Sequence, residues 1–81
     1  MNVTVRYFAA AAEAAGLEEE RLVFESGATL ASLKALLADR YGDQMRKVMD
    51  AGSFLIDQVV RRDPAAALSD RVDVLPPFAG G

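Results

Sequence analysis

Residues 29–42, with the sequence TLASLKALLADRYG, decide the fold of this chain. Thr29 suits the position before a helix, where its side-chain oxygen accepts a hydrogen bond from a free backbone amide of the first turn. Gly42 suits the position just after the helix. The apolar side chains recur at helical spacing on one stripe, and they are Leu30, Leu33, Leu36, Leu37 and Tyr41. The stretch therefore predicts one amphipathic helix that must cover an apolar surface.

Four other stretches have the alternating or β-branched pattern of strands that would form this surface. They are residues 2–8, 21–26, 54–61 and 71–75. The stretch 54–61 predicts two strands joined by a hairpin turn at Asp57-Gln58, although Gly or Asn is favoured in such turns. The order is strand, strand, helix and then three strands. An α+β fold with a mixed sheet of about five strands around one main helix is the ubiquitin-like β-grasp arrangement, whose first and last strands are parallel central neighbours.

Short helical segments complete the expected organisation. They are an alanine-rich helix over residues 9–15, a turn or two over 45–49 and one turn over 65–68. The acidic cluster Glu18–Glu20 is expected to be a solvated loop. We expect one β-grasp domain at residues 1–75, followed by an extended tail at 76–81.

Composition excludes several classes of function. The 81 residues contain no His and no Cys, which removes imidazole bases, thiolate nucleophiles and the usual zinc ligands. The formal net charge of −3 argues against a nucleic-acid surface, which needs clustered Lys and Arg. The chain shows neither a secretory signal nor a membrane segment. We therefore expect a cytoplasmic protein with no metal site and no bound cofactor, which binds neither nucleic acid nor membrane.

The last six residues, PPFAGG, carry the most specific signal. Pro76 and Pro77 lack backbone donors and favour an extended geometry, so the strand must stop and leave the domain as a stiff extension. Gly80 and Gly81 have no side chains, so the end is narrow enough to enter a tunnel. The reactive group that this design presents is the C-terminal carboxylate of Gly81. The alternative is a frayed terminus that happens to end in Gly-Gly.

An apolar patch is expected beside this tail. Phe8 and Leu75 lie on the faces opposite the core faces of their strands, and both end their strands. If these strands are parallel neighbours, the two side chains meet on the uncovered side of the sheet, where Val60 or Val59 and Phe78 extend the patch. Exposed apolar clusters on small domains usually bind partners. In the alternative, Phe8 packs under the alanine helix and Leu75 under the prolines.

Over essentially the whole chain, the residues resemble the sulfur-carrier small subunit of molybdopterin synthase. The resemblance rests on Val5-Arg6-Tyr7-Phe8-Ala9, Thr29-Leu30-Ala31-Ser32-Leu33 and Pro76-Pro77-Phe78-Ala79-Gly80-Gly81. Related carriers for thiazole or cysteine synthesis also end in Gly-Gly, but the paired prolines resemble the molybdopterin branch. Asp57-Gln58 replaces an Asn-containing turn of that pattern, and Ser69-Asp70-Arg71 replaces a Gly-Asp turn.

This resemblance implies a carrier cycle. A partner similar to ubiquitin-activating enzymes would use ATP to adenylate Gly81, and a sulfur donor would convert it to a thiocarboxylate. The tail would then enter the large synthase subunit, within a heterotetramer, and donate sulfur to cyclic pyranopterin monophosphate for molybdenum cofactor biosynthesis. Gly80 would give clearance, and catalytic side chains would belong to the partner. The docking residues would be Phe8, Val60, Leu75, Pro76, Pro77 and Phe78.

Other functions remain open. The carrier could serve thiamine thiazole or cysteine synthesis, or the chain could be a ubiquitin-like modifier joined through Gly81 to a target lysine. It could also be a noncovalent interaction module with an irrelevant tail. An enzyme acting through its own side chains is disfavoured, because a serine nucleophile would need Lys34 or Lys47 as base and neither lies in a recognisable Ser-Lys motif.

Overall fold

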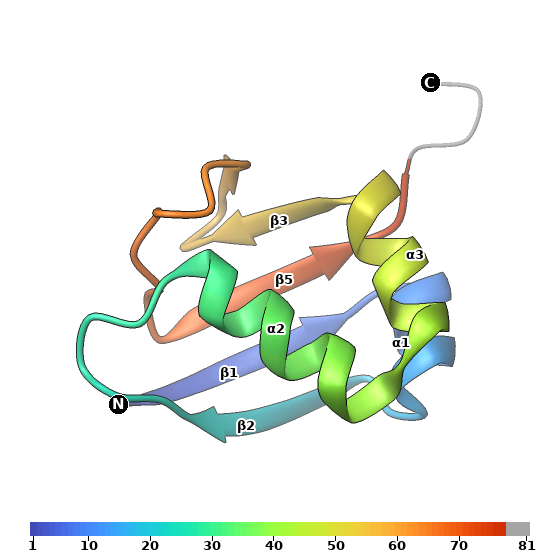
Figure 1. Cartoon of the computed structure of the whole chain (residues 1–81), viewed down its shortest axis with the longest axis horizontal. Coiled ribbons are helices and arrows are strands. Elements are labelled where there is room, and N and C mark those ends of the chain that lie inside the picture. The colour runs from blue at the N-terminus through green and yellow to red at the C-terminus, as the bar shows by residue number, and fades with distance from the viewer. Residues whose placement is uncertain (78–81) are drawn as a thin grey trace.

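The computed structural model describes residues 1–77, which form a five-stranded mixed sheet with helices packed against it (Figure 1). In chain order the elements are β1 (Asn2–Tyr7), α1 (Ala10–Ala15), β2 (Glu19–Val23), α2 (Leu30–Tyr41), α3 (Asp43–Ala51), β3 (Ser53–Ile56), β4 (Val59–Arg61) and β5 (Arg71–Leu75). The strand order is β2-β1-β5-β3-β4. Only β1 and β5 are parallel among the paired strands of the described chain, and they lie side by side. The structure confirms the predicted α+β fold.

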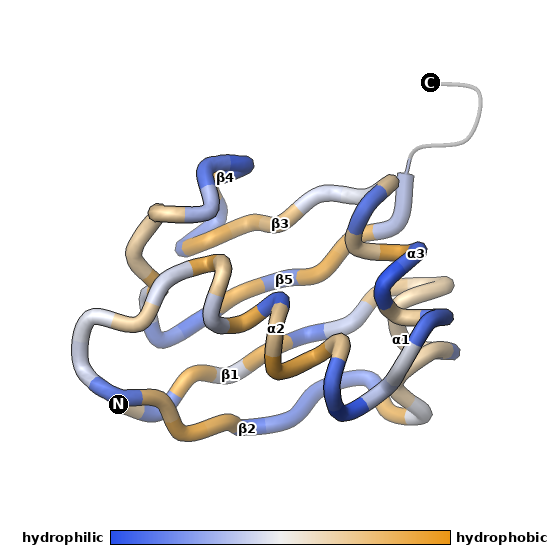
Figure 2. The backbone as a smooth tube through the Cα atoms, in the orientation of Figure 1, coloured by the Kyte–Doolittle hydropathy of each residue, from blue (hydrophilic) through white to orange (hydrophobic). Residues whose placement is uncertain are grey.

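The core lies between the sheet and α2, which crosses in front of the sheet in Figure 1. Val3, Val5 and Tyr7 of β1 point to this side and are almost fully buried. Figure 2 shows hydrophobic residues recurring along α2 and the central strands. All side chains classed as buried among residues 1–77 are hydrophobic, and fully burying one of the larger ones contributes about 1.5–3 kcal/mol. The predicted stripe of α2 supplies three of them, Leu30, Leu33 and Leu37.

One of the two longer helices differs in extent from the prediction. α2 begins as expected, with the Thr29 side chain accepting from the Ser32 amide, and ends at Gly42. α3 follows at once and runs for nine residues, longer than the expected turn or two. The few apolar residues of α3 are too far apart to indicate its full length in the sequence. Met45 and Met49 are buried in the core as predicted.

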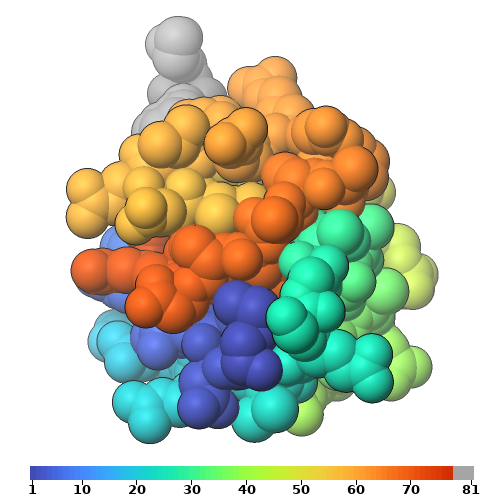
Figure 3. Space-filling view, turned by 90° about the vertical axis from the view of Figure 1, so that its left-hand side faces the viewer, coloured from blue at the N-terminus to red at the C-terminus, as the bar shows by residue number. Residues whose placement is uncertain are grey.

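The predicted helical turn at residues 65–68 is wrong. The Asp63 carboxylate accepts from the Ala65 amide at 2.9 Å and forms a tight turn instead. The Leu30 and Ala31 amides then donate to the carbonyls of Ala66 and Pro64 at 2.9 and 3.0 Å. These amides belong to the first turn of α2 and have no partner within the helix, so the loop satisfies them. Figure 3 shows this loop, in orange, packed beside the start of α2, in green.

The strand boundaries contain one confirmation and one correction. Asp57 and Gln58 have φ angles of 52° and 68°, the left-handed pair that a tight hairpin requires, so the predicted turn forms without Gly or Asn. β2 covers Glu19–Val23 rather than the predicted 21–26, because its pairing with β1 extends to Arg6 opposite Glu19. Two residues of the expected acidic loop therefore lie in a strand.

Gly52 holds the end of α3 against the end of β5. A Cβ atom at this position would lie 2.0 Å from the Leu75 carbonyl oxygen and 2.8 Å from that of Val48. Figure 1 shows the same close approach, with the end of β5 beside the last turn of α3. The absence of a side chain at Gly52 thus allows the end of α3 to lie this close to the end of β5.

Candidate functional site

The described part of the chain ends two residues after the central strand β5. The Phe8 amide donates to the Val74 carbonyl at 3.1 Å, which continues the β1–β5 pairing to the last residues of both strands. β5 ends at Leu75, and Pro76 and Pro77 follow without regular secondary structure. The predicted roles of Phe78, Gly80 and Gly81 fall on residues outside the described part of the chain. The root of the tail is therefore anchored by hydrogen bonds on the strand that the rest of the sheet surrounds.

The sheet register places the expected patch on the face opposite α2. Tyr7 pairs with Val74 and both are buried, so Phe8 and Leu75, one position on, point to the other side. Val60 pairs with Leu55 on this same open face, whereas Val59 pairs with the buried Ile56 and belongs to the core side. The register thus selects Val60 over Val59. We call the open-face residues Phe8, Leu55, Val60 and Leu75 the docking face, after the role predicted for three of them.

The docking face is less exposed than the sequence pattern implies. Val60 is 54% exposed, but Phe8, Leu55 and Leu75 are only partly exposed. The Arg6 guanidinium lies 5.2 Å from the centroid of the Phe8 ring and covers part of it. Phe8 also borders a hollow with Ala12 of α1.

Two open-face residues were missed from the sequence. Leu55 lies between Asp73 of β5 and Val60 of β4 in the register. Asp73 carries a buried carboxylate oxygen, Oδ1, with no hydrogen-bond partner among the described residues. The alternation of side chains along the strands could have found them. Asp73 lies two positions before Leu75 and so takes the same face, and Leu55 follows the core residue Phe54 and so takes the opposite face from it.

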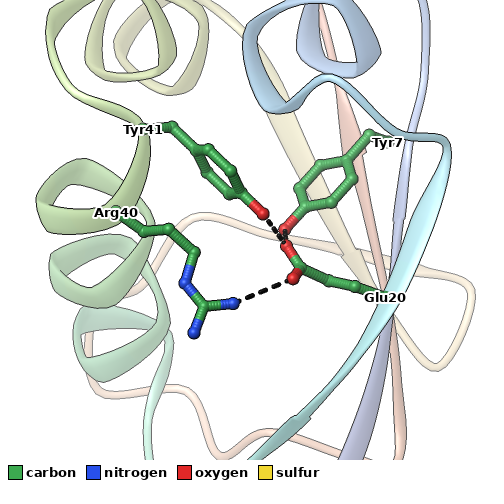
Figure 4. A network of polar contacts seen from close by, with 4 residues as sticks. All are labelled: Tyr7, Glu20, Arg40 and Tyr41. Atoms are coloured by element: carbon green, nitrogen blue, oxygen red, sulfur yellow. Dashed lines mark hydrogen bonds and ion pairs between the residues drawn. The ribbon is translucent and has the colours of Figure 1, made fainter.

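A polar network joins the edge strand β2 to the end of α2 (Figure 4). Tyr7 donates its hydroxyl to Glu20 Oε2 at 2.5 Å, and the Tyr41 hydroxyl donates to the same oxygen. Arg40 Nη1 lies 2.9 Å from Glu20 Oε1, and the Glu20 side chain is only 14% exposed. Glu20 was expected in a solvated loop, and that interpretation is wrong, since its partners lie 13 to 21 residues away in sequence.

The network keeps both phenols protonated in the folded chain. Burial, followed by the hydrogen bond to Glu20 and its charge, raises the pKa of Tyr7 far above its usual value. The same causes raise the pKa of Tyr41, and Arg40 opposes them only in part. A tyrosine that acts as a base or nucleophile needs the opposite shift.

The raised tyrosine pKa values predict how stability depends on alkaline pH. The folded state holds these protons more tightly than the unfolded state, whose tyrosines ionise near pH 10. The stabilisation is therefore complete below about pH 10 and is lost as the pH rises through the folded-state pKa values. The chain has two tyrosines and no tryptophan, so tyrosinate absorbance reports on Tyr7 and Tyr41 alone.

We expect this absorbance to appear well above pH 10 and together with unfolding seen by circular dichroism. In Glu20→Gln the transition should move to lower pH, because the negative charge that opposes tyrosinate formation is gone. Ionisation near pH 10 in a chain that stays folded would contradict this account of the network.

The described residues contain no cluster of three or more His, Cys, Asp or Glu side chains that could hold a metal ion. Within the same residues, no helix has both the length and the apolar content to cross a membrane, and α2 has 12 residues.

Comparison with known proteins adds a family and a set of similar folds. The sequence model of the ThiS family matches residues 5–81. A putative molybdopterin converting factor subunit 1 from Pyrococcus furiosus has a TM-score of 0.82 and 23% identity, over 96% of this chain and 99% of that one. No curated protein matches the sequence.

Two further solved structures extend the comparison. Small archaeal modifier protein 1 from Methanosarcina acetivorans has a TM-score of 0.78 and 26% identity, over 99% of this chain and 96% of that one. The molybdopterin-converting factor of Helicobacter pylori, solved as a complex of subunits 1 and 2, has a TM-score of 0.72 and 20% identity, with full coverage of both chains. These structures share the β-grasp fold of this chain.

Proposed function

Because the chain belongs to the ThiS family, we propose that it is the sulfur-carrier small subunit of a molybdopterin synthase. The observation that carries this proposal is the tail root. A central strand, hydrogen-bonded on both sides, runs directly into Pro76 and Pro77 beside the docking face, and the sequence after it ends in Gly80-Gly81. This arrangement fits a domain that presents its C-terminal carboxylate to a partner. The molybdopterin branch is favoured by the paired prolines and by the similar folds of two molybdopterin converting factor subunits.

The chemistry resides in the carboxylate of Gly81. An oxygen of the carboxylate attacks the α-phosphate of ATP on an adenylating partner, pyrophosphate leaves, and an acyl-adenylate forms. Sulfide then attacks the acyl carbon and displaces AMP, which gives the thiocarboxylate directly. A persulfide donor gives an acyl disulfide instead, and a thiol reduces it to the thiocarboxylate and releases the donor. Glycine suits both steps because its acyl carbon is the least hindered of any residue. ATP is used by the partner, and the carrier itself holds no cofactor.

The carrier and its partner divide the remaining work. The chain is not an enzyme by itself in this proposal, and the large synthase subunit supplies the catalytic side chains. It transfers sulfur to cyclic pyranopterin monophosphate in a cytoplasmic heterotetramer. Gly80 gives clearance inside the channel of the large subunit. The contacts come from Phe8, Val60, Leu75, Pro76, Pro77 and Phe78.

Binding to the large subunit distinguishes this pathway from the related ones. The chain and the molybdopterin synthase large subunit of the same organism should co-elute as a complex larger than either protein alone. The thiazole synthase of the same organism serves as the control and should not bind. A chain that binds the thiazole synthase and not the large subunit would reassign the carrier to thiamine synthesis.

A protein modifier is the second candidate, favoured by the 26% identity to small archaeal modifier protein 1 over nearly the whole chain. In that function a lysine amine attacks the acyl carbon of the Gly81 acyl-adenylate, AMP leaves, and an isopeptide bond forms. Covalent high-mass species that disappear when Gly81 is deleted would support it.

A further inference from the structure

A groove of about 360 Å³ lies on the side of the sheet that faces α2, away from the docking face. It runs between α2, the end of α3 and the β3–β4 hairpin, and one of its walls is Pro77. Its floor is apolar and includes Met49 and Phe54, which are 5% and 4% exposed. The groove therefore begins at the root of the tail.

Positive charge surrounds this groove on a protein whose net charge is negative. Lys34, Arg61 and Arg62 line it, and Asp50 is the one acidic residue in its wall. The ion pairs found among residues 1–77 use other side chains, so these cations are free to bind an outside partner. Lys34 Nζ lies 5.8 Å from the centroid of the Phe54 ring, which holds the ammonium over the apolar floor.

The charges at the rim favour an anionic occupant. Like charges gathered in one place repel one another, and a partially apolar surrounding weakens the screening by water. An acidic partner removes this repulsion and gains attraction to three cations. Arg61 and Arg62 are exposed at the rim, where charge acts mainly on the rate of association and on specificity.

The position of Pro77 links the groove to the chemistry at the tail. Four residues separate Pro77 from the carboxylate, and they span at most about 14 Å when extended. An enzyme that holds Gly81 in its reaction centre must therefore bring its outer surface close to the groove. The phosphates of ATP react at Gly81 itself, at the far end of the tail, so a protein segment suits the groove better than the nucleotide.

We propose that this groove docks an acidic segment of the adenylating enzyme that activates Gly81. The inference rests on the proposed function and adds the chemistry of one partner surface to it. A contact based on charge forms quickly and separates readily, which suits a carrier that must leave the enzyme after each activation. The docking face on the other side of the sheet remains available for the large subunit.

Paired charge reversals test the proposal with the intact chain and the adenylating enzyme of the same organism. The groove variant is Arg61→Glu with Arg62→Glu, and the control is Arg46→Glu with Lys47→Glu on the exposed side of α3. Both change the net charge equally, so steering by the overall field is matched. We expect the groove variant to lose about tenfold in affinity and to show a weaker dependence on salt, while the control stays within about twofold of the wild type.

Equal affinities of the two variants would overturn the groove as a docking site. The chain's own tail is the other possible occupant, and comparing amide NMR shifts of the full chain with a chain truncated after Pro77 detects it. Shift changes along the groove residues would also overturn the proposal. A failure of the proposed function would be seen with the wild-type chain instead. The chain would bind the adenylating enzyme, but the enzyme would not catalyse ATP–pyrophosphate exchange with it.

Discussion

Deleting Gly81 is expected to abolish both loading of sulfur on the chain and its transfer to the pterin. Without this residue the tail is shorter by one unit, so the carboxylate no longer reaches the α-phosphate of the ATP that the adenylating enzyme binds. Gly81→Val should have nearly the same effect, because a branched side chain crowds the acyl carbon. Sulfur transfer is measured as pterin product formed in a reconstituted mixture of carrier, large subunit, adenylating enzyme, cyclic pyranopterin monophosphate, ATP and a sulfide source.

The matched control is Ala79→Gly, which keeps the length of the tail and the terminal glycine and should retain activity. The free energy of unfolding should be unchanged in all three variants, since the packed core lies within residues 1–77. Normal transfer by the deletion variant would contradict the carrier function. A large loss of stability would show that the tail belongs to the folded domain.

Val60→Asp is expected to weaken binding to the large subunit by about 100-fold, equal to about 2.7 kcal/mol. The substitution places a charge in an apolar contact, where it loses water without gaining a partner. Val60 is 54% exposed on the short edge strand β4, so the free energy of unfolding should change by less than about 1 kcal/mol. Phe8 and Leu75 are only partly exposed, so the same change there would mix binding with stability.

Val59→Asp is the control for Val60→Asp. Val59 has the same exposed fraction, 54%, in the same strand, but the register turns it to the opposite side of the sheet. Titration calorimetry with the large subunit should therefore separate the two variants. Equal losses would show that the disturbance of β4, and not the docking face, controls binding.

Period-two alternation predicted the strands of the sheet and the core side of β1 and β5, but it left the choice between Val59 and Val60 open and misplaced the bounds of β2. The same pattern includes Leu55 and Asp73, but it does not show that they lie next to the predicted patch. Their position beside Val60 and Leu75 depends on the pairing of β5 with β3. The stripe of α2 was equally clear, since its leucines face a core that no other segment of that length can cover.

The features that were missed depend on contacts between distant segments. Glu20 looks like part of a solvated acidic run until Tyr7, Arg40 and Tyr41 are brought around it. The loop before β5 has a sequence typical of a helix start, but the free amides of α2 draw its carbonyls into a different turn. Local sequence preferences cannot predict these contacts, because the partners of Glu20 and of the loop before β5 lie in distant segments of the chain.

The central claim is that the C-terminal carboxylate of Gly81 carries sulfur, and the mass of the chain isolated from its own cells tests it most directly. Intact-mass measurement with sequencing of the C-terminal fragment should show one oxygen exchanged for sulfur, localised at Gly81. Because thiocarboxylates hydrolyse, the same measurement is made after incubation with ATP, the adenylating enzyme and a sulfur source. A plain carboxylate that persists after this incubation would contradict the account.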